Sequence, residues 1–350
     1  MLIKKNKILT LDKYIYEALY NKKNGYYMKV NPFGKKGDFT TAPNISILFS
    51  EMIAIWIISF WENLNCPKKF NLIELGAGNG EMFADIIKSF EKFPNFNKCC
   101  KFNILEKSIH LKKIQKKKLK TKKIKWLKNL DELSNIPNIF IANEFFDSLP
   151  IKQFIKKKNK WYERNIKFSK FKKPRLLDII MDIKKLEKKI GFNISYKQNF
   201  IEYSPLLLKY IKKISKKIDK NNGGILIIDY GYNDYQMKNT LQSVFNHKYN
   251  DLFDNFSNAD ITYNLNFKFI EKLFTKFNLK NNIITSQKKF LINLGILKRA
   301  EVISKKMSFS KKINIYYRLK RLIGKNLMGE LFKVMFVTKK NIQFKTGFIN

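Results

Sequence analysis

Three glycines at alternate positions, Gly76, Gly78 and Gly80, follow the acid Glu74 in the segment FNLIELGAGNG. Glycine allows a sharp backbone turn and a close ligand approach, because it has no Cβ. A helical pattern, EMFADIIKSF, begins at Glu81, and the amides at a helix start favour polar or anionic groups. A dinucleotide fingerprint would place its third glycine at Glu81. The spacing therefore predicts a ligand-binding strand–turn–helix unit of another kind, with a turn of no function as the alternative.

A second acid, Glu106, ends the apolar segment KFNILE, 26 residues beyond Gly80. An acid at the tip of the second strand of an open α/β sheet is placed to accept hydrogen bonds from a ribose diol. This position predicts a nucleoside-binding carboxylate. A surface salt bridge is the alternative interpretation.

A third group of polar residues, Asn143, Glu144 and Asp147, follows the apolar run 139–141 in NIFIANEFFDSLP. The carboxyl ends of parallel strands meet at the crevice where open α/β sheets bind ligands. Burying a carboxylate among phenylalanine and leucine side chains costs free energy unless a cation or a hydrogen-bond donor binds to it. A substrate guanidinium or amine would satisfy them. A helix-capping acid beside a surface acid is the alternative.

Two further residues, Asp38 and His247, stand in long segments that lack helical periodicity. Asp38 belongs to FGKKGDFTTAP, which we interpret as a lid across the ligand mouth or as a capped turn. His247 lies in 240–262, predicted to be a long loop on the same face of the sheet as Glu144. It could be a catalytic or substrate-binding residue, although a lone histidine is often structural.

The periodicity of the chain predicts an α/β fold of the open, Rossmann-like kind. We expect four parts: an N-terminal helical and lid segment (1–62), the first half of a ligand-binding domain (63–151), an inserted substrate-side subdomain (152–220), and the second half of the domain (221–350). Within the insertion, two strands are expected around Lys158 and Asn159, and Pro205 predicts a helix start.

The composition is strongly basic, with a net charge of +42 over 350 residues. Five of the 70 basic residues are arginine, the better bidentate phosphate ligand, so we attribute the charge to codon bias and expect no nucleic-acid partner. Cys66, Cys99 and Cys100 lack metal or redox spacing, which predicts free thiols in a reducing compartment and no metal site. The apolar stretch from Ile45 to Trp61 is interrupted by polar residues, and we expect a buried helix rather than a membrane span.

Taken together, these motifs resemble the MidA-like S-adenosylmethionine (SAM)-dependent methyltransferases, which include the mitochondrial complex I assembly-factor protein-arginine methyltransferases. The matching segments, ELGAGNG among them, run in family order along nearly the whole chain, and GDFTTAP and ANEFFDSLP are the most distinctive. The resemblance implies a class I methyltransferase fold with a seven-stranded sheet and SAM as methyl donor. It also implies symmetric dimethylation of an arginine in a complex I subunit.

The resemblance also implies residue roles. Glu74 and the three glycines would hold SAM, Glu106 would take its ribose hydroxyls, and Asn143 with Glu144 would line the methyl-transfer site. Our hypothesis makes Glu144 the orienting acid, Asp147 or Asp38 the second acid, and His247 a proton acceptor. The chain departs from the family at Asn44 and Asn266, where acids are usual.

Two other functions stay open at this point: a methyltransferase for a small molecule or RNA, and a SAM-binding assembly chaperone with little turnover. The first 10 residues lack the pattern of a signal peptide or transit sequence. We therefore expect a cytoplasmic protein if the source is bacterial. If the source is eukaryotic we expect a mitochondrial protein, although no transit peptide is visible.

Overall fold

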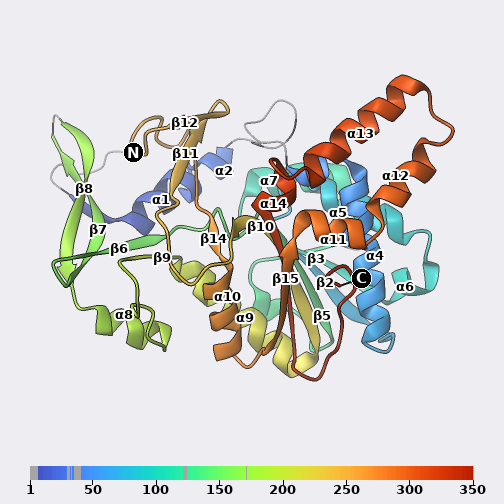
Figure 1. Ribbon diagram of the computed structural model, residues 1–350, viewed down its shortest axis with the longest axis horizontal. Coiled ribbons are helices and arrows are strands. Elements are labelled where there is room, and N and C mark those ends of the chain that lie inside the picture. Colours follow the sequence, from blue (N-terminus) through green and yellow to red (C-terminus); the bar gives the residue numbers. More distant parts are fainter. Residues whose placement is uncertain are drawn as a thin grey trace. The chain divides into compact units, whose positions relative to one another are not determined.

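The computed structural model describes residues 7–29, 32, 34, 41–120, 124–170 and 172–349 (Figure 1). The chain forms two compact units, each assembled from separate segments. Unit 1 comprises residues 1–30, 146–211 and 233–269, and unit 2 comprises residues 31–145, 212–232 and 270–350. Asp38 lies outside the described residues.

The main path of the central sheet of unit 2 has seven strands, the number that the resemblance implies (Figure 1). Their order is β15 (Asn281–Ser286), β16 (Phe332–Thr338), β10 (Gly223–Tyr232), β5 (Asn138–Asn143), β2 (Phe70–Leu75), β3 (Cys100–Leu105) and β4 (Lys125–Leu127). One further short strand pairs with β10 off this path. The strands from β10 to β4 run parallel, whereas β16 is antiparallel to both β10 and β15. Every residue of β2 is buried, which explains why its sequence is a nearly continuous apolar run.

Short helices connect and cover these strands. In unit 2 they are α3 (Ala42–Ile45), α4 (Ile47–Asn63), α5 (Glu81–Phe90), α6 (Pro94–Cys99), α7 (Ile109–Leu119), the 3₁₀ turn η1 (Leu130–Glu132), α11 (Gln287–Asn293), α12 (Ile296–Ser304), α13 (Phe309–Ile323) and α14 (Met328–Leu331). Two more, α9 (Pro205–Asn221) and α10 (Phe267–Lys276), carry the chain between the units. Among the described helices, none is long and apolar enough to cross a membrane.

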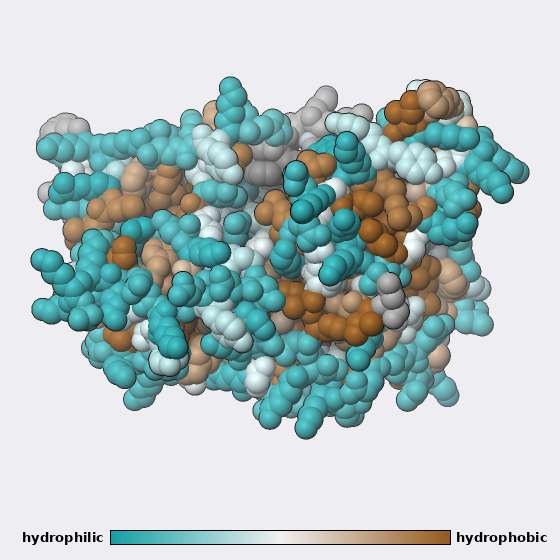
Figure 2. Space-filling view, viewed as in Figure 1, coloured by the Kyte–Doolittle hydropathy of each residue, from teal (hydrophilic) through white to brown (hydrophobic). Residues whose placement is uncertain are grey.

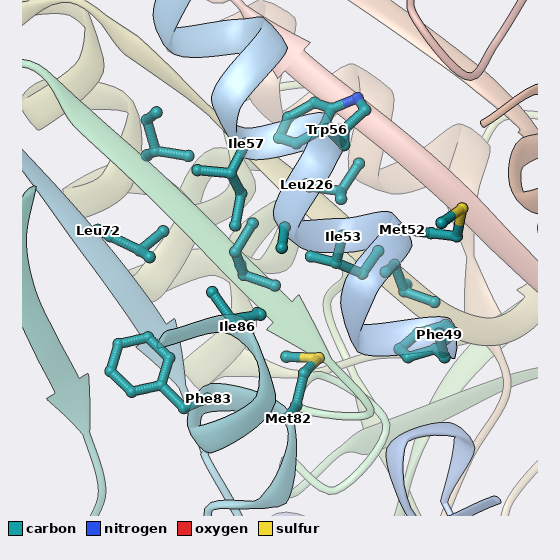
Figure 3. Packing of buried hydrophobic residues seen from close by; sticks show 14 of the residues in the cluster. Phe49, Met52, Ile53, Trp56, Ile57, Leu72, Met82, Phe83, Ile86 and Leu226 are labelled. Carbon is teal, nitrogen blue, oxygen red and sulfur yellow. The ribbon is translucent and has the colours of Figure 1, made fainter. Parts of the chain in front are cut away.

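The core of unit 2 lies where α4 and α5 pack on the sheet (Figure 3). Ser46 starts α4 by accepting a hydrogen bond from the Leu48 amide at 3.3 Å. The buried side chains labelled in Figure 3 come from α4 (Phe49, Met52, Ile53, Trp56, Ile57), α5 (Met82, Phe83, Ile86), β2 (Leu72) and β10 (Leu226). Each such side chain contributes about 1.5–3 kcal/mol when fully buried, so this layer holds the turn between β2 and α5 in place.

Unit 1 contains an antiparallel sheet made of β1 (Ile8–Thr10), β6 (Lys152–Lys157), β7 (Lys160–Ser169), β8 (Lys172–Met181) and β9 (Phe200–Tyr203). The expected pair of strands around Lys158 and Asn159 is confirmed: β6 and β7 form a hairpin, and both turn residues have positive φ, 44° and 60°. The helices of this unit are α1 (Leu11–Tyr20), α2 (Tyr26–Lys29) and α8 (Ile183–Ile190).

The expectation of a long loop over 240–262 is wrong. This segment forms a small antiparallel sheet of β11 (Gln242–Phe245), β12 (Lys248–Asn250) and β13 (Asp260–Thr262), and the two-residue β14 (Leu265–Asn266) follows. The turn between β11 and β12 is Asn246–His247, with φ of 49° and 62°. Strands of three or four residues are too short to show an alternating pattern, and no glycine marks the turn.

Candidate functional site

A pocket opens in unit 2 at the carboxyl ends of β2 and β5. The strand order reverses here, because β3 lies on one side of β2 and β5 on the other, and open α/β sheets bind ligands at such a point. The pocket holds about 370 Å³ of free space, counting the solvent at its mouth. Its lining residues are Thr41, Pro43, Glu74, Gly76, Ala77, Gly78, Asn79, Glu81, Met82, Asn143 and Glu144.

The turn after β2 requires its glycines. Gly76, Gly78 and Gly80 have φ of 69°, 53° and 78°. Residues with a Cβ rarely adopt this left-handed backbone conformation. A Cβ on Gly76 would also lie 2.7 Å from a ring carbon of Phe145. Gly80 is the N-cap of α5, so the turn delivers backbone amides of the helix start to the pocket.

Glu74 is a buried acid at the end of β2. Its Oε2 atom has no hydrogen-bond partner among the described residues. Burial, and then the nearby charge of Glu106, raises the pKa of Glu74 to about 8. A buried acceptor left without a donor is costly, and a perturbed carboxylate in a pocket is a mark of a binding site. Glu74 is therefore suited to accept a hydrogen bond from a ligand.

Glu106, just after β3, is fixed by three donors. Its Oε1 accepts from the amides of Lys107 and Ser108 at 2.8 and 2.9 Å, and its Oε2 accepts from Gln115 at 3.1 Å. Burial raises the pKa of Glu106, while these hydrogen bonds act in the opposite direction. Glu106 does not line the pocket itself but is held in one orientation next to the glycine turn.

Gln115 of α7 is a residue that the sequence analysis missed. Its side chain is fully buried and donates both to Glu106 and to the carbonyl of Gly78 at 2.9 Å. Its own carbonyl accepts from the indole of Trp126 at 2.9 Å. Gln115 thus ties the glycine turn to the acid of the next strand. The available signal was its position between Leu111 and Leu119 on the apolar face of a lysine-rich helix.

The end of β5 supplies Asn143 and Glu144. The Oδ1 atom of Asn143 is buried and has no hydrogen-bond partner within the described ranges. Glu144 has φ of 48°, and its amide donates to the carbonyl of Ile228 at 2.9 Å. A left-handed conformation costs a residue other than glycine about 1–3 kcal/mol, and such strain concentrates at functional sites. The amide of Asn143 also donates to the Glu144 carboxylate, at 3.4 Å.

Asp147 and His247 belong to unit 1, and their predicted roles stay predictions. Asp147 is buried and acts electrostatically on Tyr27. The Tyr27 hydroxyl donates a hydrogen bond of 2.8 Å to the carboxylate of Asp260. Burial, then Asp260 and more weakly Asp147, raises the pKa of Tyr27. His247 lies exposed at the tip of the β11–β12 hairpin. The sequence analysis had not singled out Tyr27.

Potential metal ligands and three cysteines occur in the described part of the chain. No group of three or more His, Cys, Asp or Glu side chains there could hold a metal ion. Cys66, Cys99 and Cys100 are free cysteines in this structure.

The decisive comparison is with protein families. A family model described as "Putative S-adenosyl-L-methionine-dependent methyltransferase" matches residues 52–284. The chain belongs to this family. The family match covers β2, the glycine turn, β5 and most of the strands that position the pocket.

Individual relatives are similar in sequence to this chain along almost its whole length. The chain is 28% identical to "Protein arginine methyltransferase NDUFAF7, mitochondrial" of Xenopus tropicalis, covering 97% of this chain and 84% of the relative. It is 26% identical to the human protein of that name, covering 94% and 80%. A Burkholderia thailandensis protein crystallised with S-adenosyl-homocysteine has the same fold, with a TM-score of 0.80 at 20% identity over 98% of this chain and 89% of that one.

The pocket of this methyltransferase fits SAM as its cofactor. The glycine turn forms one wall of the pocket, and the buried Glu74 Oε2 and Asn143 Oδ1 atoms have no hydrogen-bond donor among the described residues. Gly76, Gly78, Glu74 and Asn143 line one pocket, and Gln115 joins Glu106 to the same turn. The sequence therefore placed the SAM-dependent class correctly.

Proposed function

We propose that this methyltransferase modifies an arginine of a protein, by symmetric dimethylation, and that the acceptor belongs to a respiratory complex I subunit whose assembly is thereby aided. The names of the relatives, at 26–28% identity over 94–97% of the chain, support the protein-arginine class. The resemblance of the sequence motifs supports the complex I substrate.

SAM, when bound, supplies an electrophilic methyl group. In our proposal Glu74 and Asn143 accept or donate hydrogen bonds at the pocket wall, and the glycine turn leaves the backbone close to the cofactor. Glu106 binds the ribose hydroxyls from an orientation that Gln115 fixes. These groups position the cofactor, and positioning of the reacting atoms is the main contribution a protein makes to an in-line displacement.

Glu144 would orient the acceptor. A guanidinium is a poor nucleophile, but a carboxylate can bind its N–H groups bidentately and hold one nitrogen in the required direction. The observation that carries this proposal is the conformation of Glu144: it lines the pocket with φ of 48° at the end of β5. In the same proposal Asp147 or Asp38 is the second acid and His247 accepts the proton, and segment 152–220 forms the substrate side.

The experiment is methylation of a lysate with radiolabelled SAM and purified enzyme, using cells from which the gene has been deleted. We expect label in one protein band, released on hydrolysis as symmetric dimethylarginine. Label in RNA or in metabolites would favour the alternative acceptors. SAM binding without any label would favour an assembly chaperone. Mass spectrometry of complex I from wild-type and deletion cells then identifies the arginine that loses its methyl groups.

We also propose a reducing compartment, the cytoplasm of a bacterium or the mitochondrion of a eukaryote. Three free cysteines support it, two of them adjacent in the chain. The relatives from Xenopus tropicalis and Homo sapiens carry the word mitochondrial in their names. Fractionation of cells expressing a tagged chain tests the compartment directly.

A further inference from the structure

Helix α13 of unit 2 has two apolar faces, and only one of them is buried. Leu319 and Leu322 pack into the core. On another face, four large side chains recur at helical spacing and are exposed: Phe309 (78%), Ile313 (52%), Tyr316 (46%) and Tyr317 (66%). Positions i, i+4, i+7 and i+8 of a helix lie on one side, so these residues form a continuous stripe. We call it the α13 stripe.

The sequence around the stripe is strongly basic. Between Val302 and Gly329 the sequence contains no Asp or Glu and eight basic residues: Lys305, Lys306, Lys311, Lys312, Arg318, Lys320, Arg321 and Lys325. Two of the five arginines of the chain are among them. More exposed apolar side chains flank the helix, including Met307 and Leu327. In Figure 1, α12 and α13 form a helical pair in orange and red, and the same corner of Figure 2 shows brown and pale patches beside teal ones.

We infer that α13 binds the surface of an anionic lipid membrane. A helix that lies in the interface places aromatic and aliphatic side chains at the boundary between headgroups and acyl chains, and keeps Lys and Arg beside lipid phosphates. The α13 stripe provides the first set, and exposed lysines in and around α13, such as Lys306, Lys320 and Lys325, provide the second. A helix of 15 residues spans about 22 Å, enough for several lipid headgroups.

Charge decides against the other occupants. A second copy of the chain would bring this basic helix against another basic surface, which like-charge repulsion disfavours. A nucleic acid would suit the lysines and the tyrosine rings but offers no apolar partner to Ile313, Met307 and Leu327. A membrane rich in acidic lipid satisfies the positive charge and the exposed apolar area together. This inference does not depend on the identity of the methyl acceptor.

The test is co-sedimentation of the purified full-length chain with lipid vesicles. We expect binding to vesicles of phosphatidylcholine and phosphatidylglycerol that is roughly tenfold or more stronger than to phosphatidylcholine alone, and that weakens as salt is added. Equal sedimentation with both vesicle types, or with neither, overturns the inference.

Variants separate the apolar and electrostatic contributions. The triple change Phe309→Ser, Ile313→Ser and Tyr317→Ser should lower binding to the mixed vesicles at least about tenfold, because three apolar groups no longer insert. These side chains are exposed, so the thermal midpoint and S-adenosyl-homocysteine binding should stay unchanged. Wild-type sedimentation of this variant contradicts the inference.

A charge variant has a matched control elsewhere in the chain. Reversing Lys306, Lys320 and Lys325 to Glu should lower binding by roughly fivefold or more per residue. Reversing three exposed lysines of α8 (Lys184, Lys188 and Lys189) to Glu makes the same change in net charge and should have a much smaller effect. If both variants lose vesicle binding equally, the net charge of the protein rather than the α13 surface determines binding, and the inference is overturned. If the serine variant has a different oligomeric mass from the wild type, α13 contacts a second copy of the chain and the inference is overturned. If the wild type binds RNA but not vesicles, and the serine variant loses that RNA binding, α13 contacts RNA and the inference is overturned as well.

Discussion

The chain adopts positive φ values just after both β2 and β5, but with different residue types at the two places. After β2, the positive φ values belong to Gly76, Gly78 and Gly80. After β5, a positive φ of 48° belongs to Glu144, although glycine would adopt it without strain. One strand end therefore requires the absence of side chains, whereas the other retains a carboxylate despite a conformational cost. The contrast indicates that the first end binds a ligand along its backbone and the second acts through its side chain.

The largest expected effect comes from Glu144→Gln. The amide keeps the size of the side chain but loses the charge that would orient a guanidinium, so turnover should fall by about a thousandfold or more. S-adenosyl-homocysteine affinity, measured by calorimetry, should change little. Glu144→Gly is the complementary variant: it should be equally inactive but more stable, because it relieves the backbone strain. Methylation at the wild-type rate in either variant would remove Glu144 from the mechanism.

Gly76→Ala should disrupt the glycine turn after β2. A Cβ there meets the Phe145 ring at 2.7 Å with φ of 69°. We expect loss of S-adenosyl-homocysteine binding and about 3 kcal/mol of unfolding free energy, measured by calorimetry and denaturant titration. Gly295→Ala is the control, because Gly295 has φ of 84° but nothing within 4 Å of its Cβ. It should cost only about 1 kcal/mol and leave ligand binding intact.

Glu74 should make stability depend on pH. Its pKa in the folded protein, about 8, lies above the ordinary value of 4.5, so the folded state holds a proton that the unfolded chain releases. The unfolding free energy should therefore fall as the pH rises from about 5 to about 8, by at most on the order of 4 kcal/mol. Denaturant titrations of wild type and Glu74→Gln isolate this contribution, since Asp85 and Glu202 also have raised pKa values in both proteins. Parallel pH curves would show that Glu74 is ionised throughout.

Gln115→Leu should have the smallest effect, a loss of roughly tenfold in S-adenosyl-homocysteine affinity, because Glu106 and the glycine turn lose one shared donor. Gln287→Leu is the matched control. Gln287 is equally buried, and it donates to the carbonyl of Leu322 rather than to the pocket. Both variants should lose about 1–2 kcal/mol of stability, but only Gln115→Leu should lose affinity. Equal affinities would reduce Gln115 to a purely structural residue.

Sequence patterns revealed the strands that are buried on both faces, because such strands are runs of apolar residues. Thus β2 and β5 were predicted together with the polar residues at their ends. The region 298–330 received no assignment, although it forms most of α12, all of α13 and most of α14. Apolar residues occur on two sides of α13, which obscures a single periodic face.

Site residues were predictable when they followed a strand and not when they depended on distant partners. Glu74 and Glu144 come directly from strand ends, whereas Gln115 acquires its role through Glu106 and Gly78, 9 and 37 residues away. Asn266, where the family usually has an acid, accepts a hydrogen bond from the amide of Phe269 at 2.9 Å and starts α10. Asparagine caps helices as well as aspartate does, so this departure preserves the local structure.

The position of β16 has a consequence for synthesis of the protein. This strand lies between β10 and β15 and pairs with both, yet it is the last of the three in the chain. A nascent chain must therefore expose the open edge of β10 until residues 332–338 have left the ribosome. Unpaired strand edges promote aggregation, so we expect translation arrest before Phe332 to yield a chaperone-dependent intermediate.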